Sequence, residues 1–336
     1  MRLEGLVREV EELLPGPVRV LDDLSFSNRA LVARLAVGES TVVAKRPHRE
    51  AAFRNELEAL RILPERVRAA LVAAGAHTIV MEDLGSGPSL ADLLLGDDPV
   101  AAETALMAWA STLGAALAPT LRDGEDTEPE NLQDGLDQLC GFAADLGIAA
   151  PSEVRADVDR ISALLAKQGP WLAFCPSDTC PDNNRVYADG SVRLFDFERA
   201  GWRHAAMEAA YCRAPFCTCW CVAGLPTGLT DQMEQAFMES LSPPDRERFT
   251  NAVGVAAVGY TLATFGFFRQ YVMNDSPVGP RDRAPSTGRQ YLHSRLEMIR
   301  RDCQLPALTD FVDRIATALR RRWPEAAALP RYPAFR

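Results

Sequence analysis

The chain has 336 residues, of which 47% are hydrophobic and 24% are charged. This balance is ordinary for a globular protein and argues against a disordered or fibrous chain. The net charge of −10 opposes sequence-independent binding to nucleic acid, because that binding depends on Lys and Arg side chains that neutralise phosphates.

No run of eighteen or more apolar residues is present, and residues 1–10 have the pattern of an amphipathic helix without an apolar signal core. We therefore expect a soluble, cytoplasmic protein that does not enter a membrane. Eight cysteines are present, but a disulfide framework is typical of short secreted chains, so we expect these thiols to stay reduced.

The first quarter of the chain is predicted to form a small antiparallel sheet with one main helix. The helix is expected at 49–63, where apolar residues recur with helical spacing. The strands are expected at 18–21, 30–37, 41–45, 69–73 and 78–81.

After Asp83, a connector rich in Gly, Ser and Pro changes the character of the chain, and most of the remaining sequence is helical in pattern. We place a lobe boundary there, with a nucleotide-binding lobe at 1–83 and a helical lobe at 84–336. A cleft between the lobes would be the natural ligand site. Helices are expected at 101–117, 132–146, 152–167, 204–212, 231–241, 245–268, 286–301 and 308–321.

Three polar residues near the middle of the chain have a specific spacing: Asp178 is followed five residues later by Asn183 and eighteen residues later by Asp196. Between the last two, weakly alternating segments flank the turn-forming pair Asp189-Gly190, which predicts a hairpin that brings Asp196 back beside Asp178. Phosphoryl transfer needs a carboxylate that orients the acceptor hydroxyl, and a carboxamide and a second carboxylate that hold Mg²⁺. These three residues supply those groups.

The arrangement resembles the aminoglycoside phosphotransferase and choline-kinase-like branch of the protein-kinase-like fold, over most of residues 18–240. That branch usually reads His-Gly-Asp-x-x-x-x-Asn, followed by a strand ending Ile-Asp-Trp-Glu; the counterparts here are 176–183 and 195–198. Pro176 replaces the family histidine. Because that histidine supports the catalytic loop, the replacement affects the geometry of the loop. The resemblance implies an α+β, bilobal fold, with a small antiparallel β lobe and a larger helical lobe that carries the catalytic loop and the acceptor site.

The resemblance also implies roles for the residues of this chain. Asp178 is similar to the catalytic base, and Asn183 and Asp196 resemble the Mg²⁺ ligands. Lys45 resembles the strand lysine that contacts the α- and β-phosphates. Eleven residues on, Glu56 resembles the helix carboxylate that pairs with this lysine.

Further nucleotide contacts are implied by position. Glu82 and Leu84 lie in the segment that resembles the hinge, whose main chain would hydrogen-bond the adenine. Ser25, Ser27 and Asn28 lie where the family has its phosphate loop, and such side chains can donate hydrogen bonds to phosphate. The same loop could equally be an ordinary turn.

One further acidic side chain completes the predicted site, and another competes for a place in it. Glu208 resembles the family residue that braces the catalytic loop. Glu58 competes with Glu56 as the partner of Lys45, but it lies two positions further round the helix and would face elsewhere.

Two segments are open to more than one interpretation. The alternating cysteines of 212–221 could bind Zn²⁺, but Cys-x-x-Cys spacing is absent and a free cysteine is commonly a small buried hydrophobe. The acidic stretch 123–137 is typical of a solvated loop, although beside the cleft it could attract a cationic acceptor.

We therefore expect a kinase that uses ATP, or alternatively GTP, with Mg²⁺ to phosphorylate a hydroxyl group of a small molecule such as an antibiotic, as resistance enzymes do. One alternative keeps the chemistry and takes a sugar, an amino alcohol or a nucleoside as the acceptor. Another, from a different class, is a nucleotide-binding pseudokinase scaffold, motivated by Pro176 and by the glycine-free loop after the first strand.

Overall fold

The structure is a computed structural model that describes residues 3–25, 28–127, 131–214, 216–279, 282–326 and 328–336. The chain forms two compact units. The first contains the chain up to Ser89 together with Phe174–Thr179 and Asn183–Trp202, and the second contains Leu90–Ala173, Cys180–Asp182 and Arg203–Arg336. The segments around the predicted catalytic residues, which we expected in the helical lobe, thus cluster with the N-terminal part of the chain.

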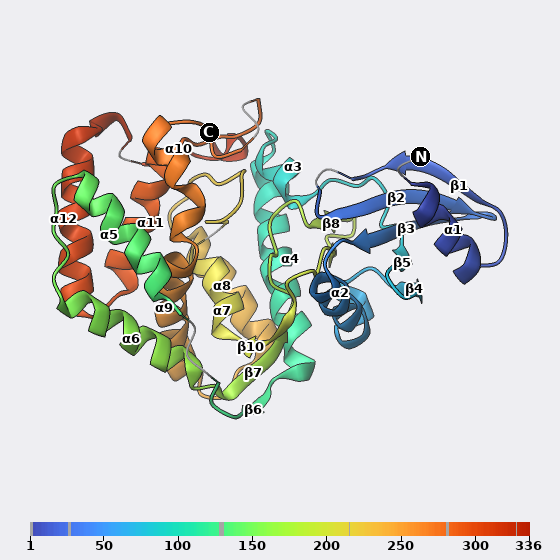
Figure 1. The fold of residues 1–336 in the computed structure, drawn as a ribbon, viewed down its shortest axis with the longest axis horizontal. Helices are drawn as coiled ribbons and strands as arrows, with labels where there is room; N and C mark the ends of the chain where they lie inside the picture. The colour runs from blue at the N-terminus through green and yellow to red at the C-terminus, as the bar shows by residue number, and fades with distance from the viewer. Residues whose placement is uncertain (1–2, 26–27, 128–130, 215, 280–281, 327) are drawn as a thin grey trace. The chain divides into compact units, whose positions relative to one another are not determined.

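The first unit is built on a five-stranded antiparallel sheet in the order β1-β2-β3-β5-β4 (Figure 1). All five predicted strands are confirmed, and two helices accompany them. The elements are β1 (Val18–Asp23), β2 (Ala30–Val37), β3 (Ser40–Pro47), β4 (Leu71–Ala74), β5 (Ile79–Glu82), α1 (Glu4–Leu13) and α2 (Glu50–Ile62).

The alternation of side chains along β3 separates the core from the polar site. Val42 and Ala44 are buried in a cluster with Leu6 and Val10 of α1. Because successive side chains of a strand point to opposite faces, Lys45 points away from this cluster. The face that Lys45 occupies is the one on which it meets a carboxylate of α2.

The predicted hairpin is confirmed in the same unit. Strands β8 (Asn184–Val186) and β9 (Val192–Leu194) pair antiparallel, with Asn184 opposite Leu194. The turn between them contains Gly190 at a φ of 81°, a left-handed conformation that glycine adopts without a steric penalty. The amide of Phe195 donates to the carbonyl of Asn183 at 3.1 Å, so the hairpin sets the position of the chain just before Asp196.

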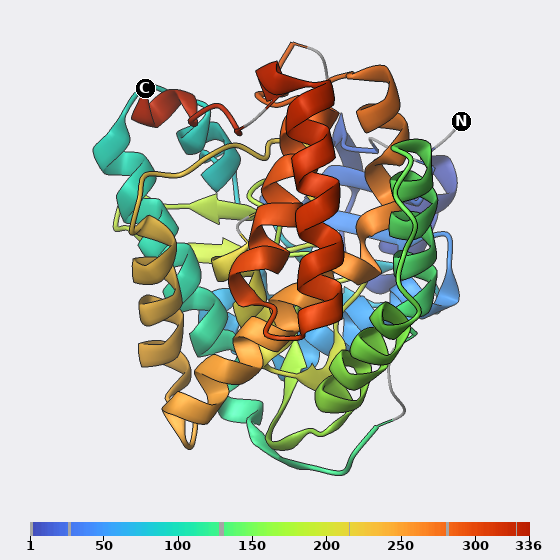
Figure 2. The same ribbon diagram turned by 90° about the vertical axis from the view of Figure 1, so that its left-hand side faces the viewer.

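The second unit is mostly helical, and each helix predicted in this part of the chain has a counterpart; α11 and α12 pack side by side (Figure 2). A short sheet in the order β10-β7-β6 was not predicted. The main elements are α3 (Leu90–Leu94), α4 (Pro99–Leu117), β6 (Arg122–Gly124), α5 (Gln133–Asp145), α6 (Glu153–Ala166), β7 (Gly169–Cys175), β10 (Gly201–His204), α7 (Ala206–Arg213), α8 (Leu229–Leu241), α9 (Arg246–Ala263), α10 (Arg269–Asn274), α11 (Gly288–Asp302) and α12 (Pro306–Arg322).

The helix expected at 245–268 is shorter than predicted. It ends at Ala263, and a 3₁₀ turn follows at Phe265–Phe268. At this point the hydroxyl of Thr264 donates to the carbonyl of Tyr260 at 2.7 Å. Thr261 makes the same contact inside the helix, so this bond alone does not end it. The apolar residues of the 3₁₀ turn continue the hydrophobic pattern, which is why periodicity does not reveal the end of the helix.

Helix α4 is apolar enough to resemble a membrane span but packs as a core helix. By length and composition, the stretch Pro99–Thr120 could cross a membrane, yet half of it is buried inside the structure. One such helix is weak evidence for a span. Gly114 lets α4 approach α8 closely, because a Cβ at this position would collide with the backbone carbonyl oxygen of Phe237.

We predict that Gly114→Ala destabilises the protein, because an added methyl group meets the backbone of α8, which cannot rotate away as a side chain can. Overpacking of this kind costs about 1–3 kcal/mol. Thr104→Ala at an exposed position of the same helix is the matched control and should change stability little. Urea unfolding would measure both, and equal stabilities would contradict the close contact.

Candidate active site

Lys45 joins three segments of the first unit. Its Nζ lies 2.5 Å from Oε2 of Glu56 in α2 and 2.6 Å from Oδ1 of Asp196, which follows β9. Lys45 is 6% exposed and Glu56 is 1% exposed. Glu58, the competing partner, is exposed. The carboxylate of α2 that contacts Lys45 is thus Glu56, the one that the resemblance pairs with it.

Burial and charge act in opposite directions on this cluster. Burial lowers the pKa of Lys45, but the charges of Glu56 and Asp196 outweigh that effect and the pKa is raised overall, so Lys45 stays an ammonium group. Burial raises the pKa of Glu56 to about 7, although the charge of Lys45 opposes the rise. The ammonium group of Lys45 thus stays charged and contacts two acidic side chains, the buried Glu56 and the partly exposed Asp196.

The backbone is unusual at both predicted acidic positions. Ser177 and Asp178 have φ values of 50° and 49°, and Asp196 has a φ of 68°. Left-handed conformations are uncommon for residues other than glycine, although Asp tolerates them better than most. Backbone strain of this kind persists where the surrounding structure holds it, and it concentrates at functional sites.

Asn183 is tied to the predicted base through the main chain. Its side-chain amide nitrogen donates to the carbonyl of Asp178 at 2.7 Å. This hydrogen bond fixes the orientation of the carboxamide and leaves its Oδ1 as the atom that could face a metal ion. Asn183 Oδ1 and the carboxylate of Asp196 are hard oxygen ligands of the kind that Mg²⁺ takes, so these residues fit the predicted ion.

The segment predicted as the hinge is held by side chains of the hairpin. Arg193 donates hydrogen bonds of 2.7 and 2.6 Å to the two carboxylate oxygens of Glu82, and these bonds lower the pKa of that carboxyl group. The main-chain N–H of Glu82 donates to Ala70. The carbonyl of Leu84 accepts from the hydroxyl of Tyr187 at 3.2 Å. The side chain of Glu82 is thus a structural partner of Arg193, and the contact of this segment with adenine stays a prediction.

The predicted phosphate loop has the contacts of a turn at Ser25. Its hydroxyl donates to the carbonyl of Val32 and accepts from the N–H of Val32, at 3.2 and 3.0 Å. The carbonyl of Asn28 lies 2.6 Å from Nδ1 of His48. Ser27 falls outside the described residues. The hydroxyl of Ser25 therefore closes the β1–β2 connection, and a phosphate contact by the loop stays a prediction.

Glu208 lies in α7 of the second unit and is 5% exposed. Its predicted bracing of the catalytic loop stays a prediction. In the acidic stretch, Asp137 forms an exposed ion pair of 2.6 Å with Arg155, and residues 128–130 lie outside the part of the chain that is described.

Two side chains of the site were missed by the sequence analysis. Nε of Arg199 lies 3.9 Å from Oδ2 of Asp178, which places a cation beside the predicted base. The carboxylate of Glu198 pairs with Arg29 at 2.6 Å, and its carbonyl accepts from the side chain of Asn55 at 3.1 Å. Glu198 belongs to the quoted motif at 195–198, so the motif could have directed attention to it; Arg199 carries no comparable signal.

Comparison with protein-family models and with curated protein sequences gave no match. Solved structures do match. Choline kinase from Cryptosporidium parvum Iowa II is 11% identical, with a TM-score of 0.54 over 92% of this chain and 99% of that one. A choline/ethanolamine kinase family protein from Mesorhizobium loti is 14% identical, with a TM-score of 0.52 over 94% and 100%. A candidate aminoglycoside phosphotransferase from Ralstonia eutropha JMP134 is 15% identical, with a TM-score of 0.50 over 96% and 97%.

At these identities the likeness shows the fold. The chain has the protein-kinase-like α+β fold that these proteins share, with an antiparallel sheet in its N-terminal part and helices in its C-terminal part. The resemblance expected from the spacing of Asp178, Asn183 and Asp196 is confirmed at that level.

We predict that Lys45→Met destabilises the protein by about 3–5 kcal/mol at pH 9, because it leaves the buried carboxylate of Glu56 without its cation. Loss of the ammonium group raises the pKa of Glu56 further above 7. A carboxyl pKa that is raised in the folded state lowers stability as the pH rises towards that pKa. In the wild type this loss ends near pH 7, whereas in the variant it continues above pH 7, so the cost of the substitution should grow from about pH 7 to 9.

The double variant Lys45→Met/Glu56→Gln is the matched control, because it removes the cation and the buried carboxyl group together. The double variant should not show the further loss of stability above pH 7 that is expected for Lys45→Met. Denaturant unfolding at several pH values would measure the free energy of unfolding of both variants. If this free energy depends on pH in the same way in the two variants, Glu56 is not the group left unpaired.

Proposed function

We propose that the protein is a kinase that uses ATP and Mg²⁺ to phosphorylate a hydroxyl group of a small molecule. The observation that carries the proposal is the contact of Lys45 with both Glu56 and Asp196, in a protein-kinase-like fold. Lysine, helix carboxylate and metal-ligand aspartate are the groups that such a fold needs beside the nucleotide phosphates.

Each group has a defined task in this proposal. Asp178 accepts a hydrogen bond from the acceptor hydroxyl, orients its oxygen towards the γ-phosphate and takes its proton late in the reaction. Lys45 contacts the α- and β-phosphates, and Glu56 holds the ammonium group in place. Asn183 and Asp196 would hold Mg²⁺, which neutralises charge on the phosphate oxygens when it is bound.

The partial burial of the cluster supports these tasks. Electrostatic stabilisation is strongest where donors and charges are positioned before the reaction and water is largely excluded. Lys45 and Glu56 meet this condition, whereas the side chain of Asp196 is 29% exposed and so remains accessible to a ligand. Asp178 is also partly exposed, as a group that must reach a diffusing acceptor has to be.

We further propose that the acceptor is a hydroxylated natural product such as an aminoglycoside-like antibiotic, and that the enzyme confers resistance in the cytoplasm. The similarity to a candidate aminoglycoside phosphotransferase supports this choice, and the similarity to choline kinases supports an amino alcohol as the alternative. A cytoplasmic location agrees with the eight cysteines, none of which forms a disulfide in the described structure.

We predict that Asp178→Asn lowers the turnover number by about 10²–10⁴-fold, because the amide cannot accept the hydroxyl proton. Binding of the Mg-nucleotide should change little, since Lys45, Asn183 and Asp196 are retained. The assay follows phosphate transfer from ATP and GTP to a panel of aminoglycosides, other antibiotics, sugars and amino alcohols, with nucleotide binding measured by calorimetry.

Asp97→Asn, the same chemical change at an exposed position, is the control and should keep full activity. Transfer to one acceptor that is lost only in Asp178→Asn would establish the enzyme and its substrate class. Mg-nucleotide binding without transfer to any acceptor would favour the scaffold, and the absence of nucleotide binding would overturn both.

A further inference from the structure

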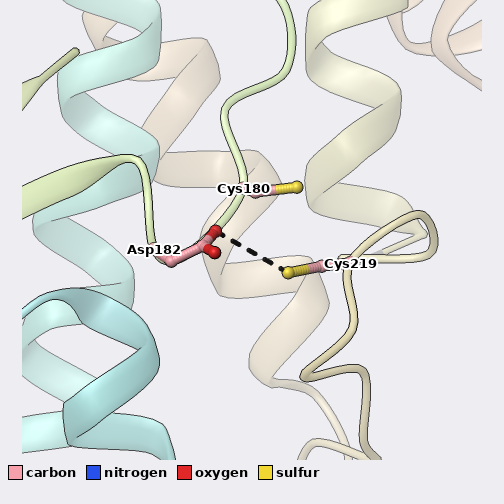
Figure 3. Close-up of side chains that lie close together, drawn as sticks. All are labelled: Cys180, Asp182 and Cys219. Carbon is pink, nitrogen blue, oxygen red and sulfur yellow. Dashed lines mark hydrogen bonds between the residues drawn. The ribbon is translucent and has the colours of Figure 1, made fainter. Parts of the chain in front are cut away.

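Two side chains of types that can bind a metal ion lie within the loop that separates Asp178 from Asn183. Cys180 and Asp182 belong to the second unit, where they meet Cys219 of the segment after α7. The ligand atoms of these three residues all lie within 4.8 Å of one another. Figure 3 shows the carboxylate of Asp182 and the thiol of Cys219 facing each other from two different loops.

A third sulfur lies next to this group. Sγ of Cys221 is 3.3 Å from Sγ of Cys219, and neither cysteine forms a disulfide. Zinc–sulfur bonds of about 2.3 Å in tetrahedral geometry separate two sulfur ligands by about 3.7 Å. The 3.3 Å between the two thiols is shorter than this, so Cys221 lies beside the group and is not counted as a ligand. The 3.9 Å between Sγ of Cys219 and Oδ1 of Asp182 is close to the separation of two ligands of one ion.

The carboxylate of Asp182 is oriented for such a role. Nε1 of Trp220 donates to Oδ2 of Asp182 at 2.9 Å, while the other oxygen, Oδ1, is the one that faces Cys219. Metal-ligating carboxylates commonly receive a hydrogen bond of this kind, which fixes the direction of the remaining oxygen. Trp220 thus supports the geometry of the cluster without being a ligand.

We propose that Cys180, Asp182 and Cys219 bind a thiophilic divalent cation, with Zn²⁺ as the metal that suits two sulfur ligands and one oxygen ligand. The thiols lose their protons as the metal binds. The cation holds 180–182 against 219–221 and thereby anchors the loop between Asp178 and Asn183. The site shares no ligand with the proposed kinase chemistry and is tested independently of it.

The sequence left undecided whether the alternating cysteines of 212–221 bind Zn²⁺. In this proposal they do not bind a metal together as one group. Cys219 is the one of them that meets Asp182, and the second sulfur ligand comes from Cys180, far earlier in the chain. The competing contact is the hydroxyl of Tyr211, which lies 3.2 Å from Sγ of Cys180 in a purely hydrogen-bonded arrangement. To bind a metal, the thiol of Cys180 would have to give up its hydrogen bond with the hydroxyl of Tyr211.

The test is a Co²⁺ titration of the full chain after reduction and removal of bound metal by a chelator. Thiolate-to-cobalt charge transfer and the intensity of the visible bands report sulfur ligands and tetrahedral geometry, and Zn²⁺ should bleach both. We expect one equivalent of Co²⁺ for the wild-type protein and for the control Cys303→Ser, a buried cysteine of the same unit outside the cluster. Cys219→Ser should lower the affinity by at least about tenfold.

Circular dichroism would establish that the variants fold, and Asp182→Asn takes the place of Cys219→Ser if the latter does not. A charge-transfer band that appears at the same Co²⁺ concentration in the wild type and in Cys303→Ser, but needs at least about tenfold more Co²⁺ in the cluster variant, supports the site. Absence of the band in the wild type, or equal affinities in the cluster variant and the control, would overturn it and leave the cluster a hydrogen-bonded core.

Discussion

A buried ammonium group held by two carboxylates is the interaction on which the first unit depends. Lys45 comes from the sheet, Glu56 from α2 and Asp196 from the end of the hairpin, so one side chain ties together three segments that are distant in the sequence. Ion pairs in such surroundings contribute little net stability, because desolvation offsets their attraction. Breaking such a pair is costly, however, because a sheet, helix or hairpin in another register would leave a charge buried without its partner.

The hairpin connects the sheet to the predicted catalytic residues and fixes their positions relative to it. Its strands place Phe195 beside Asn183, and Arg193 binds Glu82 at the end of β5. The chain on either side of the hairpin is held in left-handed conformations at Asp178 and Asp196. The cost of these conformations is offset by the hydrogen bonds and ion pairs around them, which is how a folded protein keeps reactive groups in positions that a free chain would not adopt.

The loop between Asp178 and Asn183 belongs to both units of the chain. Its ends cluster with the sheet, while 180–182 cluster with the helices, where Asp182 receives the hydrogen bond of Trp220. Groups that anchor 180–182 therefore act on the two flanking polar residues through only one or two peptide bonds. The metal ion proposed above for the cysteine cluster would therefore act on the loop through the chain itself.

The sequence by itself determined the fold class, the five strands of the sheet, the hairpin and the pairing of Lys45 with Glu56. The strands and the hairpin follow from local patterns, since strand alternation and the Asp-Gly turn depend on near neighbours along the chain. The fold class and the pairing of Lys45 with Glu56 follow from the family resemblance that the polar motif residues carry. Only the tertiary structure decided that Glu82 binds Arg193, that Arg199 lies beside Asp178 and that Cys180 meets Cys219. Such contacts join residues with no shared periodicity, and only the packing of distant segments brings them within reach.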